Sequence, residues 1–166
     1  MNEIIKSTLI TIEKSKSLLS VLSDEELSNN SISPYYSSIG SHIRHIYDFY
    51  DCSLKIDENN RVDLTDRLRI KSIENSCCSA LEHIDELIDR IKNIDFDINN
   101  EITVIDDLGT GRINIKYTFS ALLAQANSHT IHHYAIINYI LDRLNIKIVD
   151  ADFGYNPTTP KKEVPN

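Results

Sequence analysis

YTFSALLAQANSHTIHHYAIINYIL, residues 117–141, is a stretch of 25 residues without a single Asp, Glu, Lys or Arg. A stretch of this length is long enough to cross a bilayer as a helix. Its amides and its three histidines, His129, His132 and His133, make it too polar for contact with lipid. We therefore predict a helix from about residue 118 to residue 145 that is enclosed by neighbouring helices in a bundle.

Three more helices are predicted upstream of this stretch, because apolar residues recur there at helical spacing. They run over about residues 2–23, 37–56 and 65–94, and Pro34 separates the first two. Before the last helix, apolar residues alternate on either side of the GTG at 109–111, which predicts a β-hairpin with a glycine turn. The expected fold class is therefore all-α, a four-helix bundle with a short β-hairpin before the last long helix.

Length and composition predict a single soluble domain. A chain of 166 residues is most simply one domain, expected over residues 1–150 and followed by a C-terminal loop or tail over 151–166. The net charge of −8 argues against a nucleic-acid partner, because such proteins neutralise phosphates with Lys and Arg. Three cysteines without framework spacing, and a first segment without a signal-peptide pattern, indicate a cytoplasmic protein with no membrane partner.

Two of the three crowded histidines share one face of the last predicted helix. His129 and His133 are four residues apart, which places their Cβ atoms about 5–6 Å apart and lets two imidazoles bind one ion. His132 is turned about 100° away from His133 and should point at a flanking helix or at solvent. A lone His-x-x-x-His pair is a weak signal, since such histidines are more often packed in a core or lie on the surface.

A second histidine stripe makes metal binding the better interpretation. His42, His45, Phe49 and Cys52 follow three-four spacing on the predicted helix over 37–56, and facing stripes meet in a bundle. Two imidazoles from one helix and one from the other leave a coordination position open, as in catalytic rather than structural sites. Zinc and nickel are the first candidate ions, with iron and manganese next, since imidazole suits all of them. The spacing alone leaves His42 and His45 as alternative third ligands.

Other metal motifs are absent from the sequence. HTIHH, residues 129–133, lacks the Glu of the zinc-protease motif H-E-x-x-H. Glu-x-x-His pairs, typical of ferritin-like di-iron centres, do not occur on the predicted helices. The cysteines do not have zinc-finger spacing.

These histidine helices resemble the DinB/YfiT-like superfamily of four-helix bundles with a mononuclear metal site, and the order of elements resembles it over nearly the whole chain. The resemblance implies His45, His129 and His133 as metal ligands, with His42 as second choice, and places the family's acidic residue at Asp48. A narrower subgroup with G-x-H-x-R-H and a terminal DFG is closer still. These motifs are matched by residues 40–45 and 152–154.

The subgroup also has an arginine-rich stretch before its third helix, which this chain partly reproduces with Arg67, Arg69 and Glu74. Leu64 and Ile70 stand where a tyrosine and an aspartate are expected. If those two residues serve a substrate in the subgroup, this chain handles a different substrate or none.

The resemblance implies a metal-dependent transferase, similar to thiol S-transferases, or a hydrolase that acts on a small molecule. Asp48 is the weak candidate for a catalytic residue, either orienting His45 or acting as a base, and a solvated surface carboxylate is the alternative. The competing hypothesis is a non-catalytic stress-response or interaction protein whose metal is structural or vestigial. A homodimer formed through an outer helix face is a further expectation.

Overall fold

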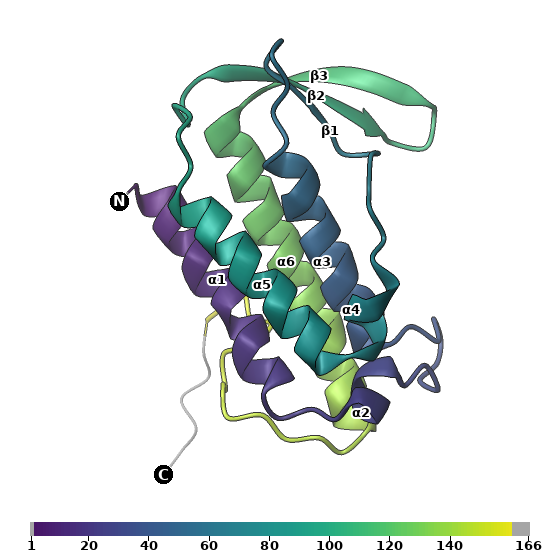
Figure 1. Cartoon of the computed structure of the whole chain (residues 1–166). Helices are drawn as coiled ribbons and strands as arrows, with labels where there is room; N and C mark the ends of the chain where they lie inside the picture. Colours follow the sequence, from purple (N-terminus) through teal and green to yellow (C-terminus); the bar gives the residue numbers. More distant parts are fainter. Residues whose placement is uncertain (1, 161–166) are drawn as a thin grey trace.

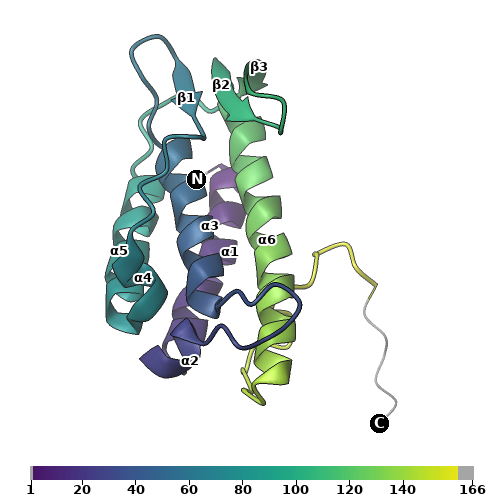
Figure 2. The same cartoon turned by 90° about the vertical axis from the view of Figure 1, so that its right-hand side faces the viewer.

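Four long helices lie side by side in the computed structural model, which describes residues 2–160 (Figures 1 and 2). A small sheet covers one end of this helical layer (Figure 1). The long helices are α1 (Glu3–Leu19), α3 (Ile39–Ser53), α5 (Cys77–Lys92) and α6 (Phe119–Arg143), the short ones are α2 (Asp24–Ser28) and α4 (Lys71–Asn75), and the strands are β1 (Arg61–Asp63), β2 (Glu101–Asp107) and β3 (Arg112–Thr118).

The prediction of an all-α four-helix bundle is wrong. Among the described residues, about 52% are helical and 11% lie in a three-stranded mixed sheet, and six helices are present. The predicted hairpin is there as β2 and β3, but β1 pairs with β2 in parallel, Val62 beside Val104. Of the three residues of β1, only Val62 is buried, and the sequence around it is that of a polar loop. A strand whose parallel partner lies far along the chain leaves no local sequence pattern, so β1 was not predicted.

The single helix predicted over residues 65–94 is also wrong, because the chain is interrupted twice there. Residues 64–70 have no helical structure, and α4 ends one residue before Ser76. The backbone of Ser76 is extended, and its hydroxyl accepts a hydrogen bond from the Ser79 N–H, so it caps a new helix, α5. Apolar residues keep their helical spacing across this break, so the sequence pattern predicted one continuous helix.

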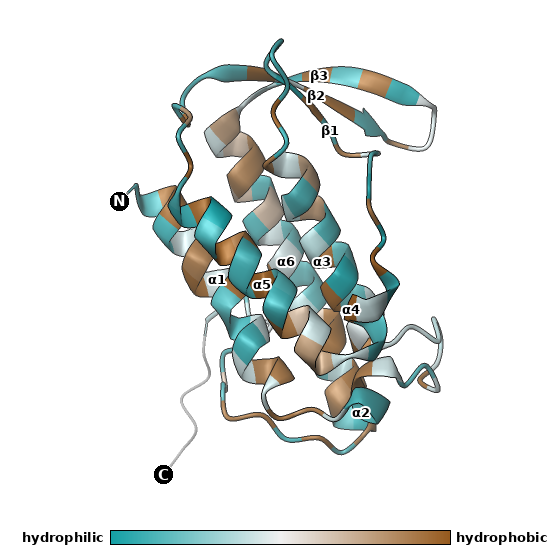
Figure 3. Ribbon diagram, in the orientation of Figure 1, coloured by the Kyte–Doolittle hydropathy of each residue, from teal (hydrophilic) through white to brown (hydrophobic). Residues whose placement is uncertain are grey.

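Burial of apolar side chains holds the long helices together. Ile12, Ile43, Ile84 and Ile137, one from each long helix, are fully buried. Apolar and polar residues alternate along the ribbons of the long helices, the pattern of amphipathic helices (Figure 3). Although α6 has 25 residues, it is not apolar enough to cross a membrane, and none of the other helices in the described part of the chain is both long and apolar enough.

The segment predicted as a C-terminal loop or tail is anchored to α6. The ring of Phe153 is buried and stacks on Tyr134 at a centroid distance of 4.5 Å, and Asn138 Nδ2 donates to the Phe153 carbonyl. A Cβ at Gly154 would lie 2.8 Å from the Ala135 backbone nitrogen, so the chain passes closely over α6. Within 151–160, the DFG motif therefore fastens the segment; residues 161–166 lie outside the described part.

Candidate metal centre

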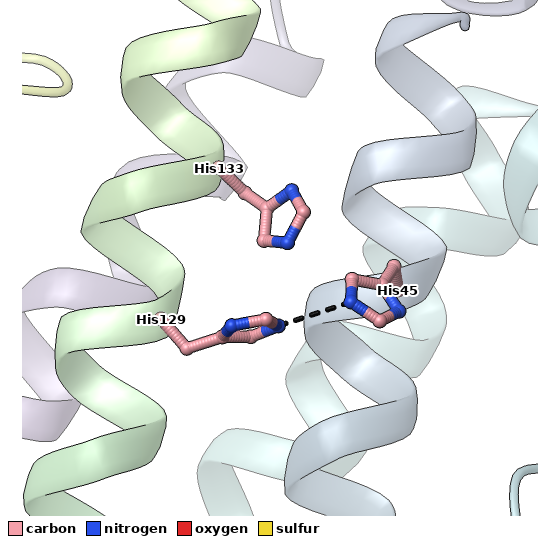
Figure 4. Close-up of side chains that lie close together, drawn as sticks. All are labelled: His45, His129 and His133. Carbon is pink, nitrogen blue, oxygen red and sulfur yellow. Dashed lines mark hydrogen bonds between the residues drawn. The ribbon is translucent and has the colours of Figure 1, made fainter. Parts of the chain in front are cut away.

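Three histidines predicted as metal ligands lie together between α3 and α6. His45 comes from α3, and His129 and His133 come from successive turns of α6 (Figure 4). Each ring offers a nitrogen, and these three nitrogens all lie within 4.8 Å of one another. The predicted sharing of one helix face holds as well, with the His129 and His133 ring centroids 4.5 Å apart.

The nitrogen positions fit a shared ion. His45 Nε2 and His129 Nε2 face each other 3.0 Å apart (Figure 4). Two imidazoles bound to one tetrahedral zinc ion at about 2.0–2.1 Å each have nitrogens about 3.3 Å apart. The pair therefore already lies near the separation that a common ion requires, and this donor set fits a divalent transition metal.

His42 is held behind the cluster rather than in it. Its Nδ1 lies 2.9 Å from Nδ1 of His133, and its Nε2 lies 2.9 Å from the Ser37 hydroxyl. Because His42 engages Nδ1 of His133, the remaining Nε2 of His133 is the nitrogen that faces the other two rings (Figure 4). In a metal site, an outer partner of this kind fixes the ring and tautomer of a ligand, so this contact would let His42 orient His133. His132 is exposed, one of the two predicted outcomes, and its ring lies 5.3 Å from that of His133 between centroids.

Burial keeps the three imidazoles in the neutral form that binds metal. It is the largest cause that lowers the pKa of His45 and His129 to about 4 and that of His133 to about 3, and the neighbouring histidines add to it. An unperturbed histidine titrates near about 6.5. At neutral pH a metal ion therefore does not have to displace protons from these rings.

The metal-free protein is expected to lose stability as the pH falls from 7 towards 4. The unfolded chain takes up protons at these histidines below about pH 6.5, whereas the folded chain does not until about pH 4, so the free energy of unfolding decreases across this window. The loss is on the order of 1 kcal/mol for each histidine between pH 7 and 5.5, less where water reaches the ring. Urea unfolding of chelator-treated protein measures it.

Burial lowers the pKa of His42 as well, so four histidines contribute to this pH slope. His133→Gln removes one of the four, and we expect it to reduce the slope by about one quarter. His132→Gln, at the adjacent exposed position of α6, is the comparison: its ring lies 5.3 Å from that of His133, and it should change the slope less than His133→Gln does. If the unfolding free energy of wild type and of His133→Gln depended equally on pH, the buried neutral histidines would not be the cause of this dependence.

Asp48 lies in a buried ion-pair network rather than against a ligand ring. Its carboxylate is 3% exposed, pairs with Arg44 and accepts the backbone N–H of Arg69 at 3.0 Å. Arg44 Nε also donates to Glu74 at 2.8 Å, which joins α3 to α4. Both oxygens of Asp48 are thus engaged, and the hydrogen bonds of the described residues do not connect it to His45. The geometry supports a structural role and lends none to the predicted catalytic one.

A cavity lies on another face of α6, away from the three histidines. It has a volume of about 510 Å³ and is lined by α1, by Ile131 and Tyr134 of α6, and by residues around Gly154. His129 and His133 do not line it. This cavity and the three clustered histidines therefore lie on different faces of α6.

Sequence reasoning missed the chain of contacts from Ser37 through His42 to His133. Ser37 precedes the N-cap of α3 and lies five residues before His42, a spacing with no motif attached to it. The histidine stripe itself was the available signal for His42, but it could not separate a ligand from its partner.

No family model, curated protein or solved structure matches this chain.

Proposed function

We propose that the chain is a mononuclear metal-binding protein in which His45, His129 and His133 hold a divalent ion, zinc or nickel first and iron or manganese next. The proposal rests on one observation: three neutral imidazoles from two helices have nitrogens within 4.8 Å of one another. The resemblance to the DinB/YfiT-like superfamily supports the same three residues and is proposed with them. It rests on His45, Asp48 and the pair on α6.

The proposed activity is metal-dependent transfer to or from a small molecule, similar to a thiol S-transferase, or hydrolysis of one. Three protein ligands leave at least one coordination position of the ion for a substrate or for water. An ion in such a site lowers the pKa of a bound thiol or water and supplies a nucleophile at neutral pH. The chain's own residues would do the positioning: His42 holds His133, and the apolar ring of Phe49 lies against His129 at 4.9 Å between centroids.

Metal content tests the proposal directly. Protein purified without a histidine tag, stripped with a chelator and refilled with zinc or nickel is expected to hold one ion per chain by elemental analysis. A bound ion should also raise the midpoint of thermal unfolding, because it binds only the folded state. Protein that holds no stoichiometric metal after refilling would contradict the proposed site.

The second candidate is a non-catalytic protein with a structural ion. One observation favours it: the cavity of about 510 Å³ does not include the histidines. The two candidates differ in whether the loaded ion accepts an added ligand. Binding of a small thiol to the metal-loaded protein supports the transferase, and a loaded protein that binds none supports the structural role.

A further inference from the structure

The loop over residues 64–70 is pinned beside the histidine stripe of α3. The thiol of Cys52 donates to the Asp66 carbonyl at 3.4 Å, and the Arg69 backbone N–H donates to Asp48 at 3.0 Å. At its start, the Leu64 N–H donates to the Ile105 carbonyl of β2. Both ends of the loop are therefore fixed to the fold, and Figure 2 shows this segment running along α3.

Arg67 lies at the centre of this loop, next to the residue that contacts Cys52. Cys52 continues the stripe of His45 and Phe49 at spacings of four and three, so the loop meets the same helix face as the metal site. The charge of Arg67 also reaches the site. After burial and the charge of His129, it is the next cause that lowers the pKa of His45, ahead of Arg44, and it acts on His129 as well.

The guanidinium of Arg67 has donors to spare. It is half-buried, and only its Nε is engaged, donating to the Leu64 carbonyl at 3.0 Å. Among the described residues it makes no ion pair, whereas Arg44, Arg61, Arg90 and Arg112 each face a carboxylate. Its two terminal nitrogens therefore remain free to bind an anion in the forked geometry that guanidinium favours.

The three histidines carry no charge of their own at neutral pH, because burial holds their pKa values well below 7. Arg44 is shared between Asp48 and Glu74, whereas Arg67 faces no carboxylate among the described residues. A divalent ion at the histidines would add positive charge beside Arg67. A cationic centre with an unpaired guanidinium next to it favours an anionic ligand.

We propose that Arg67 is a specificity residue that binds the carboxylate of a small anionic ligand whose other end reaches the three-histidine centre. The inference rests on the proposed function and narrows its substrate class to carboxylate-bearing small molecules. Two observations support it: the loop that carries Arg67 is fixed beside the stripe of His45, Phe49 and Cys52, and the two terminal nitrogens of the guanidinium are not engaged. Lysine at this position would keep the positive charge but would lack the paired N–H donors with which a guanidinium binds both oxygens of a carboxylate.

Cobalt-loaded protein and three small thiols of similar length test the proposal. The probes are 3-mercaptopropionate, 2-mercaptoethanol and cysteamine, which carry a negative, a neutral and a positive end at neutral pH. Absorption of the cobalt–thiolate bond reports binding without any assay of activity. Wild-type protein is expected to bind 3-mercaptopropionate at least about tenfold more tightly than 2-mercaptoethanol, since a hydrogen-bonded ion pair contributes that much or more.

Arg67→Gln should remove this preference while its affinity for 2-mercaptoethanol stays within about twofold of wild type. Arg69→Gln is the matched control, because it removes the same charge from the same loop and should keep the wild-type preference. Equal loss in both variants, or no loss in Arg67→Gln, would overturn the inference alone. Failure of wild-type protein to take up cobalt would instead overturn the metal centre, and the inference with it.

Discussion

His133→Ala is expected to abolish stoichiometric metal binding. The variant removes one of the three clustered nitrogens and also leaves Nδ1 of His42 without its partner. Loss of an outer partner alone typically weakens metal binding by about 10–100-fold, so loss of a ligand should exceed about 100-fold. Competition with a chromophoric chelator measures the zinc affinity, and elemental analysis measures the content.

His132→Ala is the matched control for this loss. It removes an imidazole from the adjacent, exposed position of the same helix, and zinc affinity should remain near the wild-type value. Circular dichroism of both variants separates loss of metal from loss of fold. Stoichiometric zinc in folded His133→Ala would contradict the proposed ligand set.

The two histidines of α3 should behave differently in the same assay. His45→Ala is expected to match His133→Ala, because His45 Nε2 faces His129 Nε2 across the site. His42→Ala should keep one ion per chain and weaken its affinity by about 10–100-fold, the effect of losing an outer partner. The reverse order would assign the third ligand to His42.

The candidate site could be predicted from the sequence to the extent that it depends on single helices. Helical spacing alone places His129 and His133 on one face and turns His132 away. The choice between His42 and His45 depends on how α3 is rotated against α6, which spacing within one helix does not determine. The sequence spacing left both open, the resemblance favoured His45, and the structure places His45 among the clustered nitrogens and His42 against Nδ1 of His133.

The fold shows the same division between local and non-local information. The hairpin and the start of α6 were predictable because alternation and turn residues are local, and Thr118 does cap α6. The pairing of β1 was not, since it joins Val62 to Val104 across an intervening helix pair. The break at Ser76 was missed because a capping serine inside an apolar helical pattern reads as an ordinary helix residue.

Gly40→Ala is expected to destabilise the folded protein by about 2–3 kcal/mol, the upper range for overpacking a buried site. A Cβ at this position would lie 2.2 Å from the Glu74 carbonyl oxygen and 2.8 Å from the Glu74 Cα. These are backbone atoms, so no side-chain rotation relieves the clash, and α3 must move away from α4. The gain in helix propensity, about 1 kcal/mol, does not offset this cost.

The consequence of this clash should reach the metal site. Separation of α3 from α4 pulls Arg44 from Glu74 and shifts the helix that carries His42 and His45, so zinc affinity should fall together with stability. Thermal unfolding should shift down by roughly 5–10 °C for a chain of this size. Gly111→Ala is the contrast: its φ of +101° is strained for alanine, but no atom lies within 4 Å, so it should cost about 1 kcal/mol and leave zinc affinity unchanged. A Gly40→Ala protein as stable as wild type would mean that α3 and α4 do not approach as closely as Glu74 and Gly40 indicate.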